Sequence, residues 1–314
     1  MAQMLFDLLK YPEPVYSMLS RVYTTPLRTI SSLSNSPRQA LGKSVLFWLA
    51  YLAAGYACFY IAQFLFAQFG RHNYKEWHNY GYGTLTTIAS YFITKWFLAR
   101  EGRTLSSIGM VFESHTVTRF LAGFAIGTLI LVVMVSCLIS FGQLRVHSIG
   151  EVNWASVLFW NTAFIPMALN EEIGFRAYSL QRLQTGYGQW PSQLITALAF
   201  AGIHIIGGSG WIGALVGTGT WSIVYGLSAV WSRGIALPTG MHAACNICQA
   251  LVGMKSGISA IWTLEPASSA PGSGTDISLL NGLVTQLLVM SICVSVLAWL
   301  VRKSRVREYA NDFN

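Results

Sequence analysis

Long apolar runs separated by short polar stretches dominate the chain, and eight of these runs approach twenty residues in length. They lie at 44–68, 82–99, 120–142, 154–181, 190–208, 211–231, 235–254 and 279–301. About twenty apolar residues in a helix are needed to cross the hydrocarbon core of a bilayer. The pattern therefore predicts an all-α, polytopic membrane protein with about eight transmembrane helices. Polar residues interrupt the fourth, fifth and seventh runs, so the ends of those three are the least sharply defined.

The composition supports this class. Of the 314 residues, 53% are hydrophobic and 10% are charged, whereas soluble domains carry about 25% charged residues. The net charge of +8 does not indicate nucleic-acid binding, because the basic residues gather beside particular runs. They are Lys10, Arg21, Arg28, Arg38 and Lys43 before the first run, Lys95, Arg100, Arg103 and Arg119 around the second loop, and Arg302, Lys303, Arg305 and Arg307 after the last run. Basic flanks mark the cytoplasmic side, so both termini are expected there, beside anionic lipid.

The same pattern divides the chain into three parts. We expect a basic cytoplasmic or interfacial segment at 1–43, a transmembrane helical domain at 44–302 and a basic cytoplasmic tail at 303–314. Membrane lipid is the expected partner of the helical domain, and a nucleic acid is not. The expected location is the bacterial cell membrane, with the endoplasmic reticulum as the alternative.

Three charged side chains stand inside the fourth run, in the stretch NEEIGFR at 170–176. An ionisable side chain inside a membrane is costly and therefore indicates a functional site. Glu172 and Arg176 are four residues apart, so on a helix they share a face and can form an ion pair. Glu171 is rotated by about 100° from Glu172 and is left free for proton chemistry.

Histidine and amide side chains interrupt two later runs. FAGIH ends at His204, and HAACN contains His242 and, one turn later, Asn246. With a rise of about 1.5 Å per residue, Glu171, His204 and Asn246 all lie roughly 20 Å from the expected cytoplasmic ends of their helices. Groups from three distant segments can therefore meet in one intramembrane active-site cavity, which the helices would enclose.

A carboxylate, an imidazole and an amide in one dry cavity are suited to activating water against a carbonyl group. A buried glutamate can act as a general base near neutral pH, and imidazole and amide N–H groups can stabilise an oxyanion. Alternatively, Glu171, His204 and His242 could hold a zinc ion whose bound water attacks the carbonyl. These residues alone leave both mechanisms open, and no cofactor other than zinc is indicated.

Three motifs resemble those of a known family. EEIGFR is similar to EExxxR, FAGIH to FxxxH, and LPTGMHAACN to a closing HxxxN element of the CPBP (Abi) intramembrane proteases, which include the type II CAAX prenyl endopeptidases. The motifs occur in family order, and the resemblance covers about residues 150–255. Alanine stands at position 177, where a glycine often follows the arginine in the family.

The resemblance implies an intramembrane endopeptidase that hydrolyses a peptide bond of a membrane-associated or prenylated protein substrate. It implies that Glu171 is the general base on water and that His204 shares in activating this water. Glu172 and Arg176 would organise the site, and His242 and Asn246 would bind the oxyanion. Family members are commonly labelled metalloproteases, although a metal-free glutamate mechanism is also advanced. Removal of a CAAX tripeptide takes place on the cytoplasmic side, which the inferred depth and sidedness of the site would suit.

Two other function classes remain as alternatives. A membrane scaffold or transporter could use the buried charges as a packing lock or a proton relay. A rhomboid-like serine protease could use Ser209 of GGSG (207–210) with His242, but that leaves the two glutamates unexplained. The GxxxG pairs Gly123 with Gly127 and Gly213 with Gly217 indicate close helix packing and no chemistry.

Overall fold

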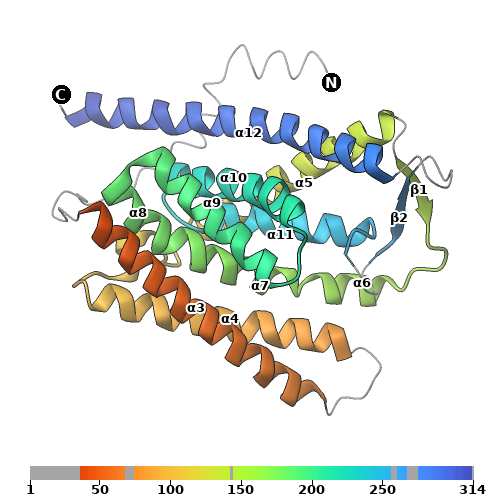
Figure 1. Cartoon of the computed structure of the whole chain (residues 1–314), viewed down its shortest axis with the longest axis horizontal. Helices are drawn as coiled ribbons and strands as arrows, with labels where there is room; N and C mark the ends of the chain where they lie inside the picture. The colour runs from red at the N-terminus through yellow and green to blue at the C-terminus, as the bar shows by residue number, and fades with distance from the viewer. Residues whose placement is uncertain (1–35, 68–73, 142–143, 256–259, 267–274, 313–314) are drawn as a thin grey trace.

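The chain is described by a computed structural model, whose described residues are 36–67, 74–141, 144–255, 260–266 and 275–312. This part is almost entirely helical, with α12 along one side of the molecule and α3 and α4 along the opposite side (Figure 1). The helices are α3 (Pro37–Phe66), α4 (Tyr74–Ala99), η3 (Leu105–Ile108), α5 (Thr116–Ser140), α6 (Trp154–Asn161), α7 (Phe164–Glu172), η4 (Ile173–Ala177), α8 (Ser179–Tyr187), α9 (Gln189–Ile206), η5 (Gly213–Thr218), α10 (Gly219–Ser232), α11 (Ala236–Leu251) and α12 (Thr275–Asp312). The prediction of an all-α class is thereby confirmed.

Three helices are long and apolar enough to cross a membrane among the residues that the structure describes. They are Pro37–Phe66, Thr116–Ser140 and Gly282–Ser304. The chain is accordingly an integral membrane protein, while the full set of eight spans stays a prediction. The remaining apolar runs fold into helices that are shorter or carry polar residues.

The fourth run is broken into four pieces, α6, α7, η4 and α8. Pro166 lies in the first turn of α7, where a missing N–H is tolerated. The turn Ile173–Ala177 is π-helical, a widened geometry that often occurs at functional sites. The hydroxyl of Ser179 donates to the carbonyl oxygens of Gly174 and Phe175, at 3.1 and 3.0 Å, and so satisfies groups at the end of this turn. The widened turn follows directly after the two glutamates, and Arg176 lies within it.

The predicted part boundaries differ from the helix ends. Residues 1–35 of the expected N-terminal segment lie outside the described residues, but α3 already begins at Pro37, with Ser36 accepting a hydrogen bond from the backbone N–H of Gln39 at 3.4 Å. A serine cap followed by proline starts a helix, even though the apolar run begins later. At the other end, α12 continues through the expected tail to Asp312, because charged residues end an apolar run without ending a helix.

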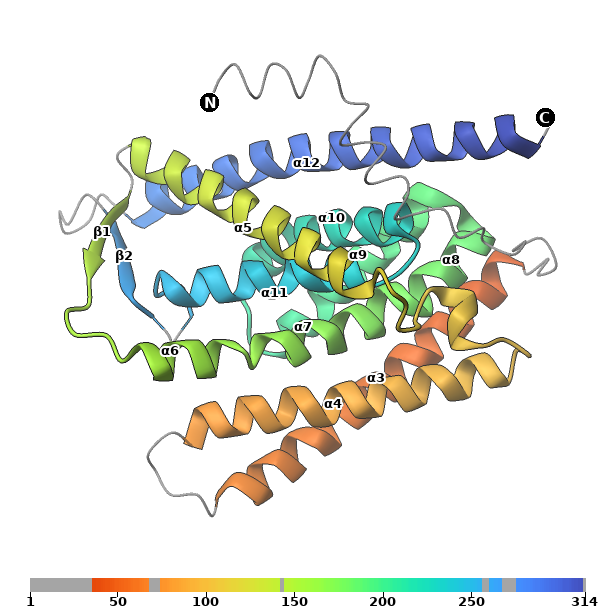
Figure 2. The same ribbon diagram turned by 180° about the vertical axis from the view of Figure 1, so that it is seen from behind.

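A close contact between α5 and α11 confirms the packing role of one GxxxG pair. A Cβ atom at Gly123 would meet the carbonyl oxygen of Leu237, and a Cβ atom at Gly127 would meet the backbone of Met241. Only glycine allows this approach of two backbones. Figure 2 shows α5 crossing beside α11, which carries His242 immediately after Met241.

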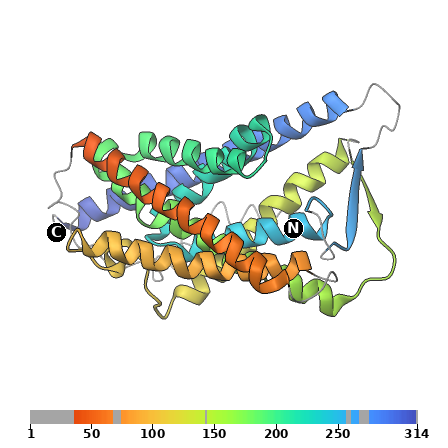
Figure 3. The ribbon, with the colours of Figure 1, turned by 60° about the horizontal axis from the view of Figure 1, so that its bottom comes forward.

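Two features were not predicted correctly from the sequence. Gly213 has open space around the position of a Cβ atom, and Gly217 faces the side chain of Gln286 at 3.9 Å, so this pair makes no close backbone contact. Strands β1 (Leu144–Ser148) and β2 (Trp262–Pro266) form a two-stranded antiparallel ribbon. Figure 3 shows this ribbon at one end of the helices, which we call the ribbon end.

The opposite end, where α3 begins and α4 ends, carries a group of charged side chains around Glu101; we call it the basic end. The Glu101 carboxylate lies 3.0 Å from Lys43 Nζ, 3.4 Å from the guanidinium of Arg182 and 3.9 Å from that of Arg103, and it accepts a hydrogen bond from the Tyr178 hydroxyl at 2.8 Å. We call these five residues the Glu101 cluster. They join α3, the end of α4 and α8, above a packed core of aromatic and aliphatic side chains.

Candidate active site

Glu172 and Arg176 form the buried ion pair that their spacing predicted. Neither side chain is exposed, and Arg176 Nη1 lies 3.2 Å from Glu172 Oε1. Arg176 Nη2 donates to the hydroxyl of Ser222 at 2.8 Å and to its carbonyl oxygen at 3.3 Å. The guanidinium also lies 4.4 Å from the centre of the Phe200 ring. These contacts fix the widened turn to α9 and α10.

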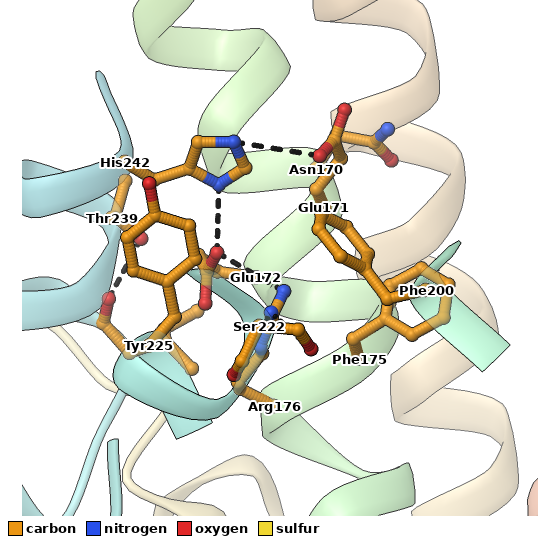
Figure 4. Close-up of polar contacts among 12 residues, drawn as sticks. Asn170, Glu171, Glu172, Phe175, Arg176, Phe200, Ser222, Tyr225, Thr239 and His242 are labelled. Atoms are coloured by element: carbon orange, nitrogen blue, oxygen red, sulfur yellow. Dashed lines mark hydrogen bonds and ion pairs between the residues drawn. The ribbon is translucent and has the colours of Figure 1, made fainter. Parts of the chain in front are cut away.

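His242 of α11 lies between the two glutamates (Figure 4). Its Nδ1 is 2.8 Å from Glu172 Oε1, and its Nε2 is 3.5 Å from Glu171 Oε2. Since an ionised carboxylate can only accept hydrogen bonds, Nδ1 carries the proton toward Glu172. The imidazole also stacks on the Tyr225 ring, with 4.6 Å between ring centres. His242 is therefore fixed in place and orientation, with Nε2 directed at Glu171.

Glu171 faces a cavity of about 330 Å³. Its side chain is 22% exposed, whereas that of Glu172 is fully buried. The cavity is lined from α3, α4, α7 and the end of α9, and its polar lining includes Tyr51, Tyr82, Asn170 and Glu171. The Asn170 amide donates to the Tyr51 hydroxyl at 2.9 Å. Glu171 Oε2 and Asn170 Oδ1 are buried atoms that have no hydrogen-bond partner among the described residues.

His204 packs beside this group through Phe200 without bonding to it, and Asn246 follows His242 by one turn of α11. His204 Nδ1 is 2.9 Å from the carbonyl oxygen of Phe200, and its ring packs against the Phe200 ring at 4.6 Å. Phe200 also contacts His242, with 6.2 Å between ring centres. Within the described part of the chain, no hydrogen bond or ion pair joins His204 to either glutamate or gives the Asn246 side chain a partner. The imidazole nearest Glu171 is therefore that of His242, although the sequence had favoured His204.

The alternative arrangements considered from the sequence are not formed. Across residues 36–67, 74–141, 144–255, 260–266 and 275–312, no group of three or more His, Cys, Asp or Glu side chains is placed to hold a metal ion. Glu171, His204 and His242 are thus not gathered into a zinc site in this structure. The backbone N–H of Ser209 donates to the carbonyl oxygen of His204 at 2.9 Å in the turn after α9, and no hydrogen bond joins Ser209 and His242 in the described residues.

Sequence reasoning missed Tyr51, Ser222 and Tyr225, which hold the site in place. Each lies in an otherwise apolar run, where a hydroxyl group gives no sign of the partner that it meets in three dimensions. Asn170 stood directly before the two glutamates and offered a usable signal, since an amide inside an apolar run needs a partner.

Comparison with protein families gives a match at residues 153–248 to the model described as type II CAAX prenyl endopeptidase Rce1-like. This segment contains all six residues nominated from the sequence: Glu171, Glu172, Arg176, His204, His242 and Asn246. The family resemblance read from the three motifs is thereby confirmed. Comparisons with curated proteins and with solved structures gave no match.

Proposed function

Because residues 153–248 form a segment of the type II CAAX prenyl endopeptidase-like family, we propose that this protein is an intramembrane endopeptidase. One observation carries the proposal: a fully buried glutamate fixes an imidazole whose other nitrogen faces a second, cavity-lining glutamate. Because one carboxylate is fully buried and the other lines the cavity, the two can perform different tasks in a hydrolase. One holds the site together, and the other is free to exchange a proton with water.

In the proposed reaction, Glu171 takes a proton from a water molecule in the cavity as that water attacks the peptide carbonyl carbon. Collapse of the tetrahedral intermediate breaks the C–N bond, and Glu171 returns the proton to the leaving amine. One water is consumed, and one new carboxylate and one new amine are formed. His204 Nδ1 is bonded to a carbonyl oxygen, so its Nε2 carries a lone pair that can orient the water.

His242 and Asn246 are assigned to the oxyanion. With both imidazole nitrogens protonated, the charges of Glu171, Glu172, Arg176 and His242 sum to zero, a favourable balance for buried groups. Nε2–H of His242 can then donate to the developing oxyanion, and the amide of Asn246 follows one turn later on the same face of α11. Glu172 stabilises the positive imidazole through its hydrogen bond to Nδ1.

The cavity lies about midway along α4, where Tyr82–Ser90 line it. Its lining comes from Tyr51–Tyr60 of α3 and from the last turn of α9 and Gly207, whereas the core at the basic end is filled by packed side chains. We propose a membrane-associated peptide as substrate, and the family match favours a prenylated one. We propose that such a peptide reaches the cavity from within the bilayer, and cytoplasmic access stays a prediction from the charge pattern.

The test is cleavage of a farnesylated peptide by the purified protein in lipid vesicles, followed by mass spectrometry of the products. We expect the wild type to release a carboxyl-terminal fragment and Glu171→Gln to be slower by about 10²–10⁴-fold, the usual effect of losing a general base. Glu151→Gln is the matched control, because Glu151 is exposed and lies outside the site. A chelator arm reports whether the reaction depends on metal. Cleavage by Glu171→Gln at the wild-type rate would instead assign the glutamates to packing.

A further inference from the structure

A tyrosine of α3 reaches the proposed catalytic site from outside the segment that matches the family. Tyr51 lines the same cavity as Glu171, and its side chain is 8% exposed. The family match covers residues 153–248, so neither the match nor the three motifs point to this position. The proposed reaction also assigns no task to the phenol group of Tyr51.

Packing against the widened turn fixes the Tyr51 ring. The ring meets Phe175 edge to face, with 5.7 Å between ring centres and 82° between the planes. A Cβ atom at Gly174 would lie 2.7 Å from Cε2 of the ring and 2.8 Å from Cζ, the carbon that carries the hydroxyl. Glycine at position 174 therefore leaves room for the ring where a larger residue would displace it. The turn that holds Arg176 thus also holds Tyr51.

Asn170 determines how the Tyr51 hydroxyl is used. The Asn170 amide donates to the Tyr51 oxygen at 2.9 Å, so this oxygen is the acceptor and the hydroxyl keeps its own hydrogen for another partner. No hydrogen bond donated by the Tyr51 hydroxyl is found in the part of the chain that the structure describes. A buried donor without an acceptor is costly, which suits this group to an acceptor that a substrate brings.

The carbonyl oxygen of the cleaved bond is the acceptor that fits this donor. Asn170 directly precedes Glu171 in α7, so the Tyr51 hydroxyl is held at the part of the cavity where water would be activated. When that water attacks the carbonyl carbon, negative charge develops on the carbonyl oxygen. A donor that is fixed before the reaction stabilises this charge without reorganisation. Because hydrogen bonds in a chain polarise one another, the bond from Asn170 also makes the phenol a stronger donor.

We propose that Tyr51 is a catalytic residue that donates a hydrogen bond to the carbonyl oxygen of the bond being cleaved. It acts together with the donors assigned to His242 and Asn246, and Asn170 is the positioning residue that directs its hydroxyl. This inference rests on the proposed endopeptidase function and deepens it. The phenol keeps its proton throughout, so the proton that Glu171 takes from water still goes to the leaving amine.

Kinetics of Tyr51→Phe test the hydroxyl, because this change removes one oxygen atom and keeps the ring. For a farnesylated peptide in lipid vesicles we expect kcat to fall by about 10²–10³-fold, the usual effect of losing one donor to an oxyanion. KM should stay nearly unchanged, since the bond strengthens only in the transition state. Tyr91→Phe is the matched control, because it removes the same atom from an exposed tyrosine of α4 that does not line the cavity.

Asn170→Ala tests the positioning role. It should lower kcat by a smaller factor than Tyr51→Phe does, and it should add little to Tyr51→Phe in the double variant, because both changes act through the same hydroxyl. Fully additive losses in the double variant would contradict this assignment of Asn170. A melting temperature above the assay temperature for each variant shows that a lost rate is not caused by unfolding.

A second substrate identifies the atom that accepts the bond. In a thioamide peptide, sulfur replaces the oxygen of the carbonyl to be cleaved, and sulfur accepts hydrogen bonds only weakly. The rate ratio of wild type to Tyr51→Phe should therefore be at least roughly tenfold smaller for the thioamide than for the amide. A role of Tyr51 in packing alone would lower both rates by the same factor, and that result would overturn the inference.

Two outcomes separate this inference from the proposed function. Equal rates for Tyr51→Phe and Tyr91→Phe on the amide peptide would overturn the inference and leave the endopeptidase function standing. A wild-type protein that cleaves no peptide would refute the function and the inference together.

Discussion

Removal of the Glu172 carboxylate should destabilise the fold rather than only slow the reaction. In Glu172→Ala, the guanidinium of Arg176 loses an acceptor at 3.2 Å and Nδ1 of His242 loses one at 2.8 Å. Arg176 and His242 are 1% and 6% exposed, so water does not replace the lost acceptor. Leaving one partner of a buried ion pair alone costs about 3–5 kcal/mol. That is a large part of a typical total stability of about 5–15 kcal/mol.

Thermal unfolding of the purified protein in detergent measures this cost. We expect Tm of Glu172→Ala to fall by roughly 6–20 °C, taking about 2–4 °C per kcal/mol for a chain of this size class. Glu171→Ala is the matched control, because its carboxylate is partly exposed and makes one contact at 3.5 Å. The double variant Glu172→Ala/Arg176→Met should recover part of the loss, since it removes the stranded charge. If Glu172→Ala has the same Tm as Glu171→Ala and the wild type, Glu172 is not the buried residue that stabilises this site.

Two further predictions concern residues outside the catalytic group. Glu101→Gln should lower the free energy of unfolding by about 3 kcal/mol, because it leaves the cations of the Glu101 cluster without a carboxylate. Glu113→Gln removes one ion pair at 3.8 Å whose carboxylate is 38% exposed, so it should change the free energy of unfolding by less than about 1 kcal/mol. Equal melting temperatures for these two variants would contradict a stabilising role of the cluster. Gly127→Ala should cost about 1–3 kcal/mol through overpacking and reduce cleavage, since the new Cβ meets the Met241 backbone beside His242. Gly42→Ala has open space and should do neither, so a normal melting temperature and rate for Gly127→Ala would show that α5 does not position α11.

Local spacing was sufficient to predict one half of the candidate site. The pairing of Glu172 with Arg176 follows from positions four apart on a helix, and it survives the widened turn between them. Close helix packing at Gly123 and Gly127 was likewise predicted, because glycines spaced by four form a groove on a single helix face, but the partner helix α11 was not. Both predictions concern geometry within one helix.

The other half depends on how separate helices are rotated about their axes, which no spacing in the sequence fixes. His204 and His242 both appeared at useful depths, but the chain gave no means of deciding which imidazole faces Glu171. In the structure, backbone contacts determine which imidazole faces Glu171. The α5 helix packs against the α11 backbone beside His242, and the carbonyl oxygen of Phe200 accepts a hydrogen bond from His204 Nδ1. The ribbon of β1 and β2 pairs segments more than a hundred residues apart, so it could not be predicted from local spacing either.

The Glu101 cluster lies at the basic end, and its residues do not line the cavity of the proposed active site. Tyr178, Arg182 and a core of packed side chains stand at that end, so we expect an arriving peptide and the departing fragments to use the same entrance to the cavity. The fragment that leaves more slowly would then limit turnover, because it competes with the incoming peptide for that entrance. A fragment that carries a lipid can depart sideways into the bilayer, which gives such an enclosed site a physical reason to prefer lipid-bearing peptides.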